Sequence, residues 1–473
     1  MASFSCFLIS FLLSSLSVSF PLLSTASSSS SNTFILPLSS LSSLHPTPTP
    51  DLTEKLTHFA TLSLTRARHI KNPSKRPSPS HSRIPLYPQG YGGYSIPLSF
   101  GTPPQTKPFI MDTGSSLVWF PCTQTYQCKN CNFKGMPKGG VTPFLPKSSS
   151  SARILGCANP KCGLIHRRTT PESRCKDCRP PFTNCNQICP SYIIIYGSGS
   201  TGGLALVESL TLPGKKVPNF LVGCSVFSAR QPAGIAGFGR GPTSLPAQLG
   251  LTRFSYCLVP HRFDDTGKSS SLAMETGSVA GQRTGNLSRT PFLKNPQVAG
   301  RDPLSVYYYV NLRKISIGGV KVKIPHKHIS PDLRGNGGTI VDSGSSFTFL
   351  THDVFEAVQG ALVKEVKKTY PRAGELEKVT GLRPCFNISG HKTADLPAMK
   401  FHFKGRAEMD LPLGNYFSIV ATDTVCLTMV TDDAVNGSAV GPSIILGNFQ
   451  MQNFYVEYDL KNDKFGFRQQ LCK

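Results

Sequence analysis

Two short segments of the sequence each place one aspartate among apolar residues. The first, FIMDTGSS, contains Asp112, and the second, TIVDSGSS, contains Asp342. A carboxylate inside an apolar stretch costs free energy unless a partner compensates for it. The two aspartates lie 230 residues apart in a chain of 473 residues. The repeat predicts two homologous lobes, each of which contributes one carboxylate to a shared cleft.

Two carboxylates held close together cannot both ionise easily, so they share one proton and titrate as a pair. The ionised carboxylate can take a proton from water, and the protonated one can donate to a substrate carbonyl oxygen. This chemistry requires neither a cofactor nor a metal ion. Glycine after each Asp-Thr or Asp-Ser pair allows a tight turn that brings N–H groups to the carboxylate. The residues expected to support the pair are Thr113, Gly114, Ser115, Ser343, Gly344 and Ser345.

The rest of the chain predicts a mainly β protein with few short helices. Residues 94–100 alternate apolar and polar side chains, and residues 305–325 predict two strands joined by a turn at Gly318-Gly319. One good amphipathic helix is expected over residues 351–370, with Thr351 or Asp353 at its N-cap. A further short helix is expected at TSLPAQLG. The apolar face of the long helix comprises Val354, Phe355, Val358, Leu362 and Val366.

The formal net charge of +24 comes from basic residues that are scattered along the chain. They do not form runs interleaved with aromatic residues, so the pattern argues against a nucleic-acid-binding protein. The charge raises the weaker hypothesis of affinity for an acidic cell-wall polysaccharide. We expect a soluble, basic, secreted monomer that does not contact a membrane once its signal peptide has been removed.

The first 26 residues predict a signal peptide. They are apolar and end with small residues at Ser24 and Ala26, which suit a cleavage site. The usual positively charged n-region is missing, and a signal anchor is the alternative. Residues 27–83 are rich in Ser, Pro and Thr and lack a continuous core pattern. They indicate either a disordered linker or, as we predict, a propeptide. Its basic part contains Arg66, Arg68, Lys71, Lys75, Arg76 and Arg83. We expect the ionised cleft to attract this part at neutral pH and acid to release it.

The chain has 15 cysteines, and removal of the signal peptide with Cys6 leaves an even number. In a secreted protein this favours disulfides. Two Cys-X-X-Cys motifs raise the alternative of a zinc site, but the separation of Cys131 and Cys175 is too long for a typical zinc ribbon. Three Asn-X-Ser sequons, which suit a secreted glycoprotein, lie at Asn286, Asn387 and Asn436.

From about residue 90 to the C-terminus, the chain resembles the pepsin-like aspartic proteases. The resemblance implies a bilobal fold with a hairpin flap, whose tyrosine is Tyr196, followed by Gly197, and whose tryptophan partner is Trp119. It also implies an Ile-Ala-Gly segment at 235–237 and an Ile-Leu-Gly segment at 445–447 behind the catalytic loops. The GSGSTG run in the flap matches a dinucleotide-binding pattern, but a strand pattern follows it instead of the required helix.

The expected organisation is an N-terminal lobe at 84–285, with a cysteine-rich insert at 122–189, and a C-terminal lobe at 286–473. The insert, the FSYCLV segment and the DSGSS motif resemble the nepenthesin-like, or atypical, plant aspartic proteases. Cys175 and Cys178 depart from the usual nepenthesin-like set. The resemblance implies the disulfides Cys122–Cys224, Cys128–Cys131, Cys257–Cys472 and Cys385–Cys426. It leaves open the pairing of Cys157, Cys162, Cys175, Cys178, Cys185 and Cys189.

The expected function is that of an acid endopeptidase that cleaves proteins or peptides between bulky apolar residues. The alternative is a catalytically silent binding protein, because plant xylanase inhibitors resemble this fold and have lost parts of the active site. Both aspartates, both glycines, Tyr196 and Trp119 are present here, which favours the enzyme. The chain between Ser346 and Ile445 leaves no room for the saposin-like insert of typical plant vacuolar aspartic proteases. Secretion to the apoplast is therefore favoured over the vacuole.

Overall fold

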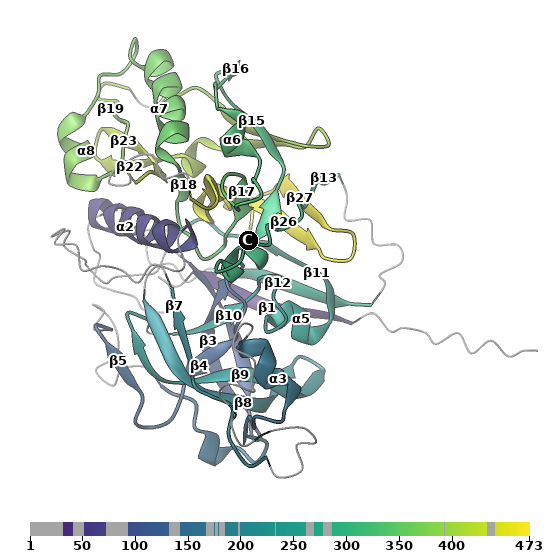
Figure 1. Ribbon diagram of the computed structural model, residues 1–473. Coiled ribbons are helices and arrows are strands. Elements are labelled where there is room, and N and C mark those ends of the chain that lie inside the picture. The colour runs from purple at the N-terminus through teal and green to yellow at the C-terminus, as the bar shows by residue number, and fades with distance from the viewer. Residues whose placement is uncertain are drawn as a thin grey trace, which may run out of the picture. The chain divides into compact units, whose positions relative to one another are not determined.

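The computed structural model describes residues 32–40, 52–71, 93–131, 142–166, 175, 178, 185–196, 199–231, 233–261, 269–277, 286–391, 393–432 and 440–473. Strands dominate this part of the chain (Figure 1), which confirms the predicted mainly β class. The strands predicted at 94–100 and 305–325 are present, and a turn at Gly318-Gly319 with two positive φ angles joins the latter pair.

A 15-stranded sheet runs through both halves of the sequence. The last strands of the chain, β26 and β27, lie beside β11, so both predicted lobes share this sheet. Its strands are β1 (Thr33–Ser40), β2 (Tyr94–Phe100), β3 (Gln105–Asp112), β4 (Trp119–Pro121), β5 (Gln127–Lys129), β6 (Arg153–Ile154), β7 (Tyr192–Ile195), β8 (Ser200–Leu212), β9 (Lys215–Ala229), β10 (Gly234–Gly237), β11 (Leu251–Cys257), β12 (Ser269–Thr276), β13 (Ser288–Pro291), β26 (Phe454–Asp459) and β27 (Lys464–Gln469).

Three smaller sheets belong to the C-terminal half. The first contains β14 (Tyr308–Val310), β17 (Thr339–Val341), β18 (Thr348–Leu350), β24 (Met429–Val430) and β25 (Ile444–Leu446). The second contains β15 (Leu312–Ile317), β16 (Val320–Lys321), β20 (Met399–Phe403) and β21 (Glu408–Leu411). The third contains β19 (Cys385–Asn387), β22 (Phe417–Ala421) and β23 (Thr424–Leu427).

The sequence repeat corresponds to a repeated four-strand unit. In the first copy the order is β3-β10-β4-β9, and in the second it is β17-β25-β18-β24. In both copies the first pair is parallel, the second antiparallel and the third parallel. Asp112 is the last residue of β3, and Asp342 directly follows β17. Equivalent strands therefore present the two aspartates.

The helices confirm part of the prediction. The amphipathic helix is α7 (His352–Val366), with Thr351 at its N-cap, and all five predicted apolar-face residues are buried. The short helix at TSLPAQLG is α5 (Leu245–Leu249). The other short helices are α3 (Pro160–Ile165), α6 (His326–Ile329) and α8 (Gly374–Thr380), with 3-10 turns η1 (Pro146–Ser148), η2 (Asp302–Ser305), η3 (Leu413–Asn415) and η4 (Phe449–Met451).

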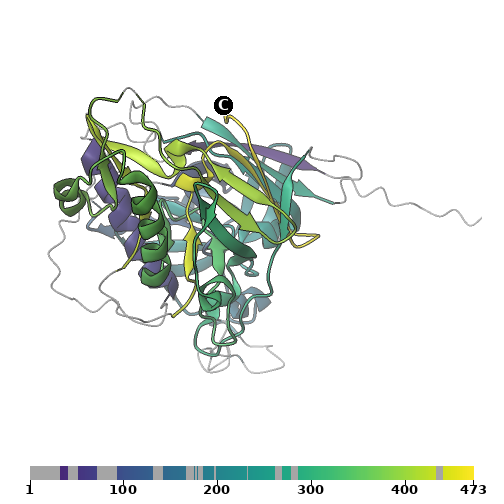
Figure 2. The ribbon, with the colours of Figure 1, turned by 90° about the horizontal axis from the view of Figure 1, so that it is seen from above.

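Two segments of residues 27–83 are ordered, which argues against the alternative of a disordered linker. β1 lies between β12 and β2 in the large sheet, and Figure 2 shows it in purple among strands of later sequence. The second segment forms α2 (Leu52–Lys71), a helix of 20 residues that was not predicted. Its apolar face was missed because it is small and interrupted by polar residues: Leu56, Phe59, Ala60, Ser63, Ala67 and Ile70.

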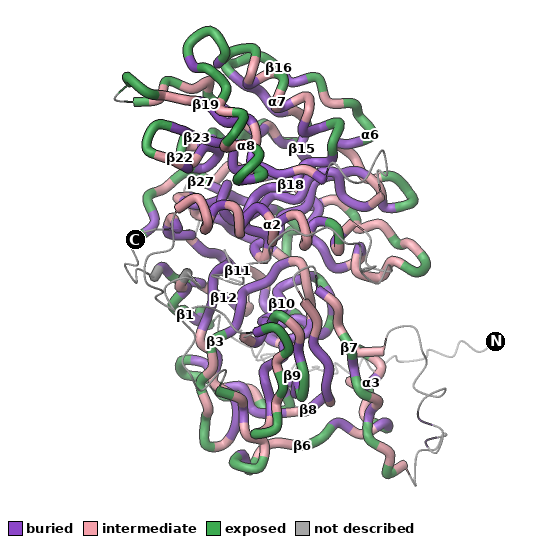
Figure 3. Tube along the Cα trace, turned by 90° about the vertical axis from the view of Figure 1, so that its left-hand side faces the viewer, coloured by how far each residue is buried: buried purple, intermediate pink, exposed green. Residues whose placement is uncertain are grey.

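α2 packs against the C-terminal half of the chain, beside α8 and β22 (Figure 1). Leu56, Phe59 and Ile70 belong to the same core cluster as Phe347 and Phe349. Burial of each such side chain contributes about 1.5–3 kcal/mol. Figure 3 shows the helix mostly in pink, the colour of intermediate burial, and of its 20 residues only Arg68 is exposed. The helix is thus an integral part of the folded chain.

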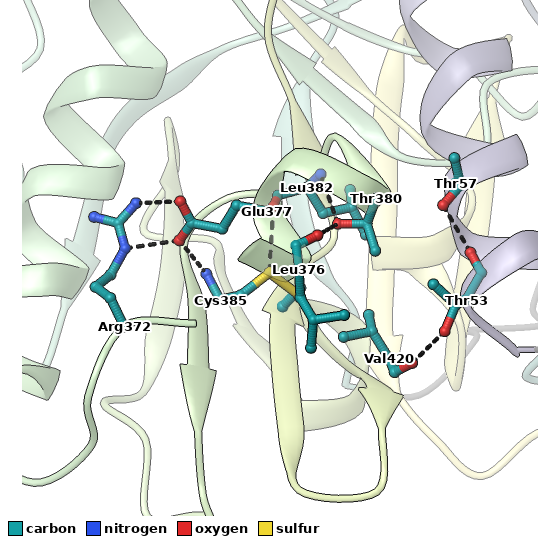
Figure 4. Close-up of a disulfide and its surroundings, with 10 residues drawn as sticks. Thr53, Thr57, Arg372, Leu376, Glu377, Thr380, Leu382, Cys385 and Val420 are labelled. Carbon is teal, nitrogen blue, oxygen red and sulfur yellow. Dashed lines mark hydrogen bonds and ion pairs between the residues drawn. A yellow bond between two sulfur atoms is a disulfide. The ribbon is translucent and has the colours of Figure 1, made fainter. Parts of the chain in front are cut away.

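Seven disulfides hold the described part of the chain, and they include the four that the resemblance implied. The remaining cysteines pair as Cys157–Cys175, Cys162–Cys189 and Cys178–Cys185. Figure 4 shows the surroundings of Cys385–Cys426, where Thr53 at the start of α2 donates a hydrogen bond to the Val420 carbonyl. Among the described residues, no helix is both long and apolar enough to cross a bilayer.

Candidate active site

Asp112 and Asp342 are buried, with 1% and 0% of their side-chain surfaces exposed. Each accepts the same two hydrogen bonds from its own loop. Asp112 accepts from the Gly114 N–H at 2.9 Å and the Ser115 hydroxyl at 2.6 Å. Asp342 accepts from the Gly344 N–H at 3.1 Å and the Ser345 hydroxyl at 2.6 Å. The repeated sequence thus produces a repeated hydrogen-bond pattern around both carboxylates.

Thr113 and Ser343 tie the two loops together. The Thr113 N–H donates to the Ser343 hydroxyl at 3.1 Å, and the Ser343 N–H donates to the Thr113 hydroxyl at 2.9 Å. The two hydroxyls in turn donate to carbonyls of the opposite strands, at Val341 and Met111. All these groups are buried, so the network fixes one loop relative to the other.

Replacing Thr113 with valine is expected to destabilise the fold. Valine has a similar shape but leaves the Ser343 N–H and the Val341 carbonyl without their partner. Two lost hydrogen bonds of this kind cost about 2–4 kcal/mol. Thermal unfolding followed by circular dichroism measures the effect, and Thr113→Ser, which keeps the hydroxyl, is the matched control. Equal melting temperatures for both variants would contradict the cross-linking role.

Gly114 and Gly344 allow the two loops to approach closely. A Cβ atom on Gly114 would lie 2.6 Å from an Asp342 oxygen, and one on Gly344 would lie 2.5 Å from an Asp112 oxygen. Neither distance is compatible with a real side chain. Each glycine therefore makes room for the carboxylate of the other loop, which explains why glycine stands in both motifs.

Arg66 of α2 bridges the two carboxylates. Its Nη2 lies 2.5 Å from Asp112 Oδ1 and 2.8 Å from Asp342 Oδ1, and its Nε lies 2.5 Å from Asp342 Oδ2. The Arg66 side chain is 11% exposed. A planar guanidinium suits this geometry, because its fork of N–H groups can donate to several oxygens at once. The expected attraction between the basic segment and the carboxylates thus corresponds to one specific contact.

The electrostatics of the three groups follow from burial and proximity. Burial raises the pKa of Asp112, and the Asp342 charge raises it further, while Arg66 opposes both effects. Burial would also raise the pKa of Asp342, but the charge and hydrogen bonds of Arg66 bring it below its usual value. Asp112 is therefore the carboxyl group that more readily holds a proton, and Asp342 the one that more readily stays ionised.

Tyr196 and Trp119 form a buried pair beside the carboxylates. The Trp119 indole N–H donates to the Tyr196 hydroxyl at 2.8 Å, and Tyr196 directly follows β7. A cavity of about 570 Å³ separates β7 from α2. Its lining includes Arg66, His69, Gly114, Ser115 and Tyr196. An extended ligand could occupy this space next to the aspartates once α2 moves away.

Two residues that the sequence did not single out support the second loop. Asn448 donates its backbone N–H to the Ser345 carbonyl at 2.8 Å and its side-chain amide to the Ser343 carbonyl at 3.1 Å. His261 contacts the Asn448 amide oxygen at 3.2 Å and packs against Phe59 of α2. Asn448 follows the Ile-Leu-Gly segment, which could have drawn attention to it, whereas nothing in the sequence marks His261.

The Ile-Ala-Gly and Ile-Leu-Gly segments lie beside the aspartate-bearing strands, in β10 and immediately around β25. Asn286 is exposed and Asn387 is half-buried, so both remain candidate glycosylation sites. Gly197, Asn436, the signal peptide and the basic residues Lys75, Arg76 and Arg83 lie outside the described residues. GSGSTG leads into β8, so no helix follows it to bind a pyrophosphate.

Two family models match the chain. The model described as xylanase inhibitor N-terminal covers residues 94–274, and the model described as xylanase inhibitor C-terminal covers residues 307–469. Together they span more than half of the sequence and include both aspartate motifs.

Curated relatives are similar over most of their length. The chain is 32% identical over 417 residues to a probable aspartyl protease of Arabidopsis thaliana, covering 80% of this chain and 82% of that protein. It is 31% identical over 391 residues to aspartic proteinase nepenthesin-1 of Nepenthes gracilis, covering 81% of this chain and 79% of that protein.

Solved structures share the fold at low sequence identity. The crystal structure of edgp matches with a TM-score of 0.62 and 18% identity, covering 93% of this chain and 95% of that one. Basic 7S globulin from soybean matches with a TM-score of 0.59 and 17% identity, covering 93% and 96%. At this identity the similarity supports the fold alone.

Proposed function

Because the chain belongs to the plant family of pepsin-like aspartic proteases, we propose that it is a secreted aspartic endopeptidase made as an inactive precursor. The observation that carries this proposal is the matched environment of Asp112 and Asp342. Both carboxylates accept a glycine N–H and a serine hydroxyl, and both lie within reach of one guanidinium. Two such carboxyl groups can hydrolyse a peptide bond together, one as general acid and the other as general base.

In the proposed reaction, the ionised Asp342 takes a proton from a water molecule as its oxygen attacks the scissile carbonyl carbon. The protonated Asp112 donates its proton to the carbonyl oxygen, which gives a neutral gem-diol. As the C–N bond breaks, the amine takes a proton from Asp342, and a gem-diol hydroxyl returns its proton to Asp112. Free carboxylic acid and amine result, with the protonation of both aspartates restored. The opposite pKa directions of the two groups apply to the inhibited chain, where Arg66 lies between them, so this scheme rests on the single proton that the pair shares.

The precursor is inactive, in this proposal, because α2 occupies the place of the substrate. Arg66 covers both carboxylates, and the helix is anchored along its length. Thr53 binds the Val420 carbonyl, the Ser63 hydroxyl accepts from the Phe347 N–H at 2.8 Å, and the Lys71 carbonyl accepts from Arg301 at 2.9 Å. The propeptide at 27–83 therefore acts as an internal inhibitor that must leave before a substrate can bind.

His69 is expected to promote release of α2 in acid. Burial and the charge of Arg66 lower the pKa of His69 to about 4, below the value of 6.5 for a free histidine. The inhibited state is therefore stable above pH 6.5 and loses about 3 kcal/mol as the pH falls towards 4, because protonation favours the released helix. His69→Gln cannot take up this proton, so its activation midpoint is expected to shift to lower pH.

The midpoint is measured as the rate of peptide cleavage against the pH of preincubation. His391→Gln, a substitution at an exposed histidine, is the matched control and is expected to leave the midpoint in place. An unchanged midpoint in His69→Gln would show that protonation of His69 does not drive release.

The proposed substrates are proteins or peptides with bulky apolar residues around the scissile bond, and the proposed location is the apoplast, with the vacuole as the alternative. We test the activity by incubating the full-length chain in acid with a denatured protein and identifying the new peptide ends by mass spectrometry. The proposal predicts cleavage between apolar residues. Intact substrate after α2 has been released would contradict it.

A second candidate function is that of a catalytically silent binding protein. The family models described as xylanase inhibitor favour it. Inhibition of a purified xylanase by the full-length chain tests this candidate. Inhibition without proteolysis would favour the binding protein, whereas proteolysis without inhibition would favour the enzyme.

A further inference from the structure

We propose that Asp432 and Phe349 form a subsite that selects a basic side chain, arginine or lysine, in the substrate. The inference rests on the proposed endopeptidase function and specifies its substrate class. In the structure, α2 of the same chain fills this subsite with its own cations. The substrate would take their place when the helix leaves.

Arg68 binds Asp432 through two parallel hydrogen bonds. Its Nε lies 2.5 Å from Asp432 Oδ2, and its Nη2 lies 2.7 Å from Oδ1. The carboxylate is 5% exposed, whereas the arginine side chain is 47% exposed. With α2 in place the carboxylate is thus nearly buried, and the arginine pairs with it from the solvent side. Bidentate pairing of this kind selects a guanidinium by shape as well as charge.

Lys71 provides a second cation at the same place. Its ammonium lies 5.1 Å from the centre of the Phe349 ring, within the range of a cation–π contact. Burial lowers the pKa of Lys71 to about 8, and the Asp432 charge opposes this effect. Phe349 pairs with Val430 across β18 and β24, and Asp432 lies two residues beyond Val430. A carboxylate and an aromatic face thus form one cation-binding surface.

The position of this surface relative to the aspartates makes it a substrate subsite. Arg66 contacts Asp112 and Asp342, and Arg68, only two residues further along α2, contacts Asp432. Residues two apart on a helix point to different sides of it, so Asp432 lies on another side of α2 than Asp112 and Asp342 do. A substrate that takes the place of α2 would pass both sets of carboxylates, and we expect one of its side chains near the scissile bond to reach Asp432.

The experiment uses the full-length chain after acid has released α2. The assay is run at about pH 5, where an ordinary aspartate is ionised. Pairs of quenched fluorescent peptides differ only by arginine or citrulline, its neutral analogue, at each of three positions on either side of the scissile bond. At one position we expect the kcat/KM of the arginine peptide to be about tenfold higher than that of the citrulline peptide. A ratio of this size corresponds to one charged hydrogen bond that solvent partly screens.

Asp432→Asn is expected to bring this ratio close to one, and Asp432→Lys to reverse the preference towards a glutamate peptide. Asp410→Asn, which removes an exposed carboxylate from β21, is the matched control and should keep the ratio. A purely structural role for Asp432 would lower the rates for all peptides equally and would leave the ratio unchanged.

The outcomes separate this inference from the proposed function. Cleavage with equal rates for arginine and citrulline at every position would overturn the basic subsite and leave the endopeptidase standing. If no peptide is cleaved, the endopeptidase proposal fails, and the dissociation constants of the same peptides, measured by fluorescence anisotropy, test the subsite. Equal constants would overturn it, and tighter arginine binding that Asp432→Asn abolishes would support it.

Discussion

Replacement of Arg66 by glutamine is expected to give a full-length chain that cleaves peptides at about pH 6, where the unaltered chain is silent. Arg66 is the cation that lies between Asp112 and Asp342. Without it, the helix would cover two buried carboxyl groups and leave their charge uncompensated. Removing one partner of a buried ion pair costs about 3–5 kcal/mol. This cost favours the open helix by roughly a hundredfold to several thousandfold.

The initial rate of cleavage of a quenched peptide measures this effect, with a gel to verify that the chain is still intact. The cleavage rate of Arg66→Lys is expected to lie between those of the unaltered chain and Arg66→Gln, because one ammonium cannot reproduce the contacts of the guanidinium fork. Arg372→Gln removes an arginine from a more exposed ion pair with Glu377 and serves as the matched control. If Arg66→Gln stays silent at pH 6 but becomes fully active in acid, Arg66 is not the inhibitory contact.

Replacement of Asp112 by asparagine is expected to abolish proteolysis in acid, with a loss of at least a hundredfold to ten-thousandfold in kcat. Asparagine keeps an oxygen that can accept the Gly114 N–H, so the loop retains its shape. It cannot, however, carry the proton that the carbonyl oxygen of the substrate requires. Arg66 would still contact Asp342, so the precursor is expected to remain folded and inhibited.

The rate is measured with the same quenched peptide after acid release of α2. Asp342→Asn is expected to be as inactive as Asp112→Asn, since the reaction needs both groups. Asp463→Asn, at an exposed carboxylate that pairs with Arg240, is the matched control and should retain full activity. Substantial cleavage by Asp112→Asn would exclude the two-carboxylate mechanism.

The parts of the fold that could be predicted are those that repeat or that show a strong local pattern. The two aspartate motifs predicted two equivalent units, and β3 and β17 occupy equivalent places. The face of α7 has five large apolar residues at helical spacing, and the structure buries all of them. In both cases the signal is a short pattern of residue types that can be recognised without knowing the fold.

α2 and its contacts could not be predicted because their determinants lie far away in the sequence. Arg66 binds a carboxylate 276 residues later, and Arg68 binds one 364 residues later. The apolar face of the helix includes alanines and a serine, so it gains stability only from the surface that receives it. Basic charge indicated attraction to the cleft, but not which arginine would enter it.

Cysteine pairing shows the same limit. The resemblance implied four disulfides and left six cysteines of the insert open, and six cysteines allow fifteen pairings. The structure selects one of these because the fold brings Cys162 next to Cys189 and Cys157 next to Cys175. Such proximity arises from the packing around β8 and α3, which the local sequence does not encode.

Cleavage of a denatured protein by the unaltered full-length chain, followed from acid to neutral pH with and without pepstatin, tests the central claim most directly. Pepstatin is a peptide inhibitor of the pepsin-like family. We predict no cleavage near neutrality, cleavage in acid after release of α2, and complete inhibition by pepstatin. A folded chain whose α2 has been released, and which cleaves nothing at any pH, would contradict the claim and favour the silent binding protein.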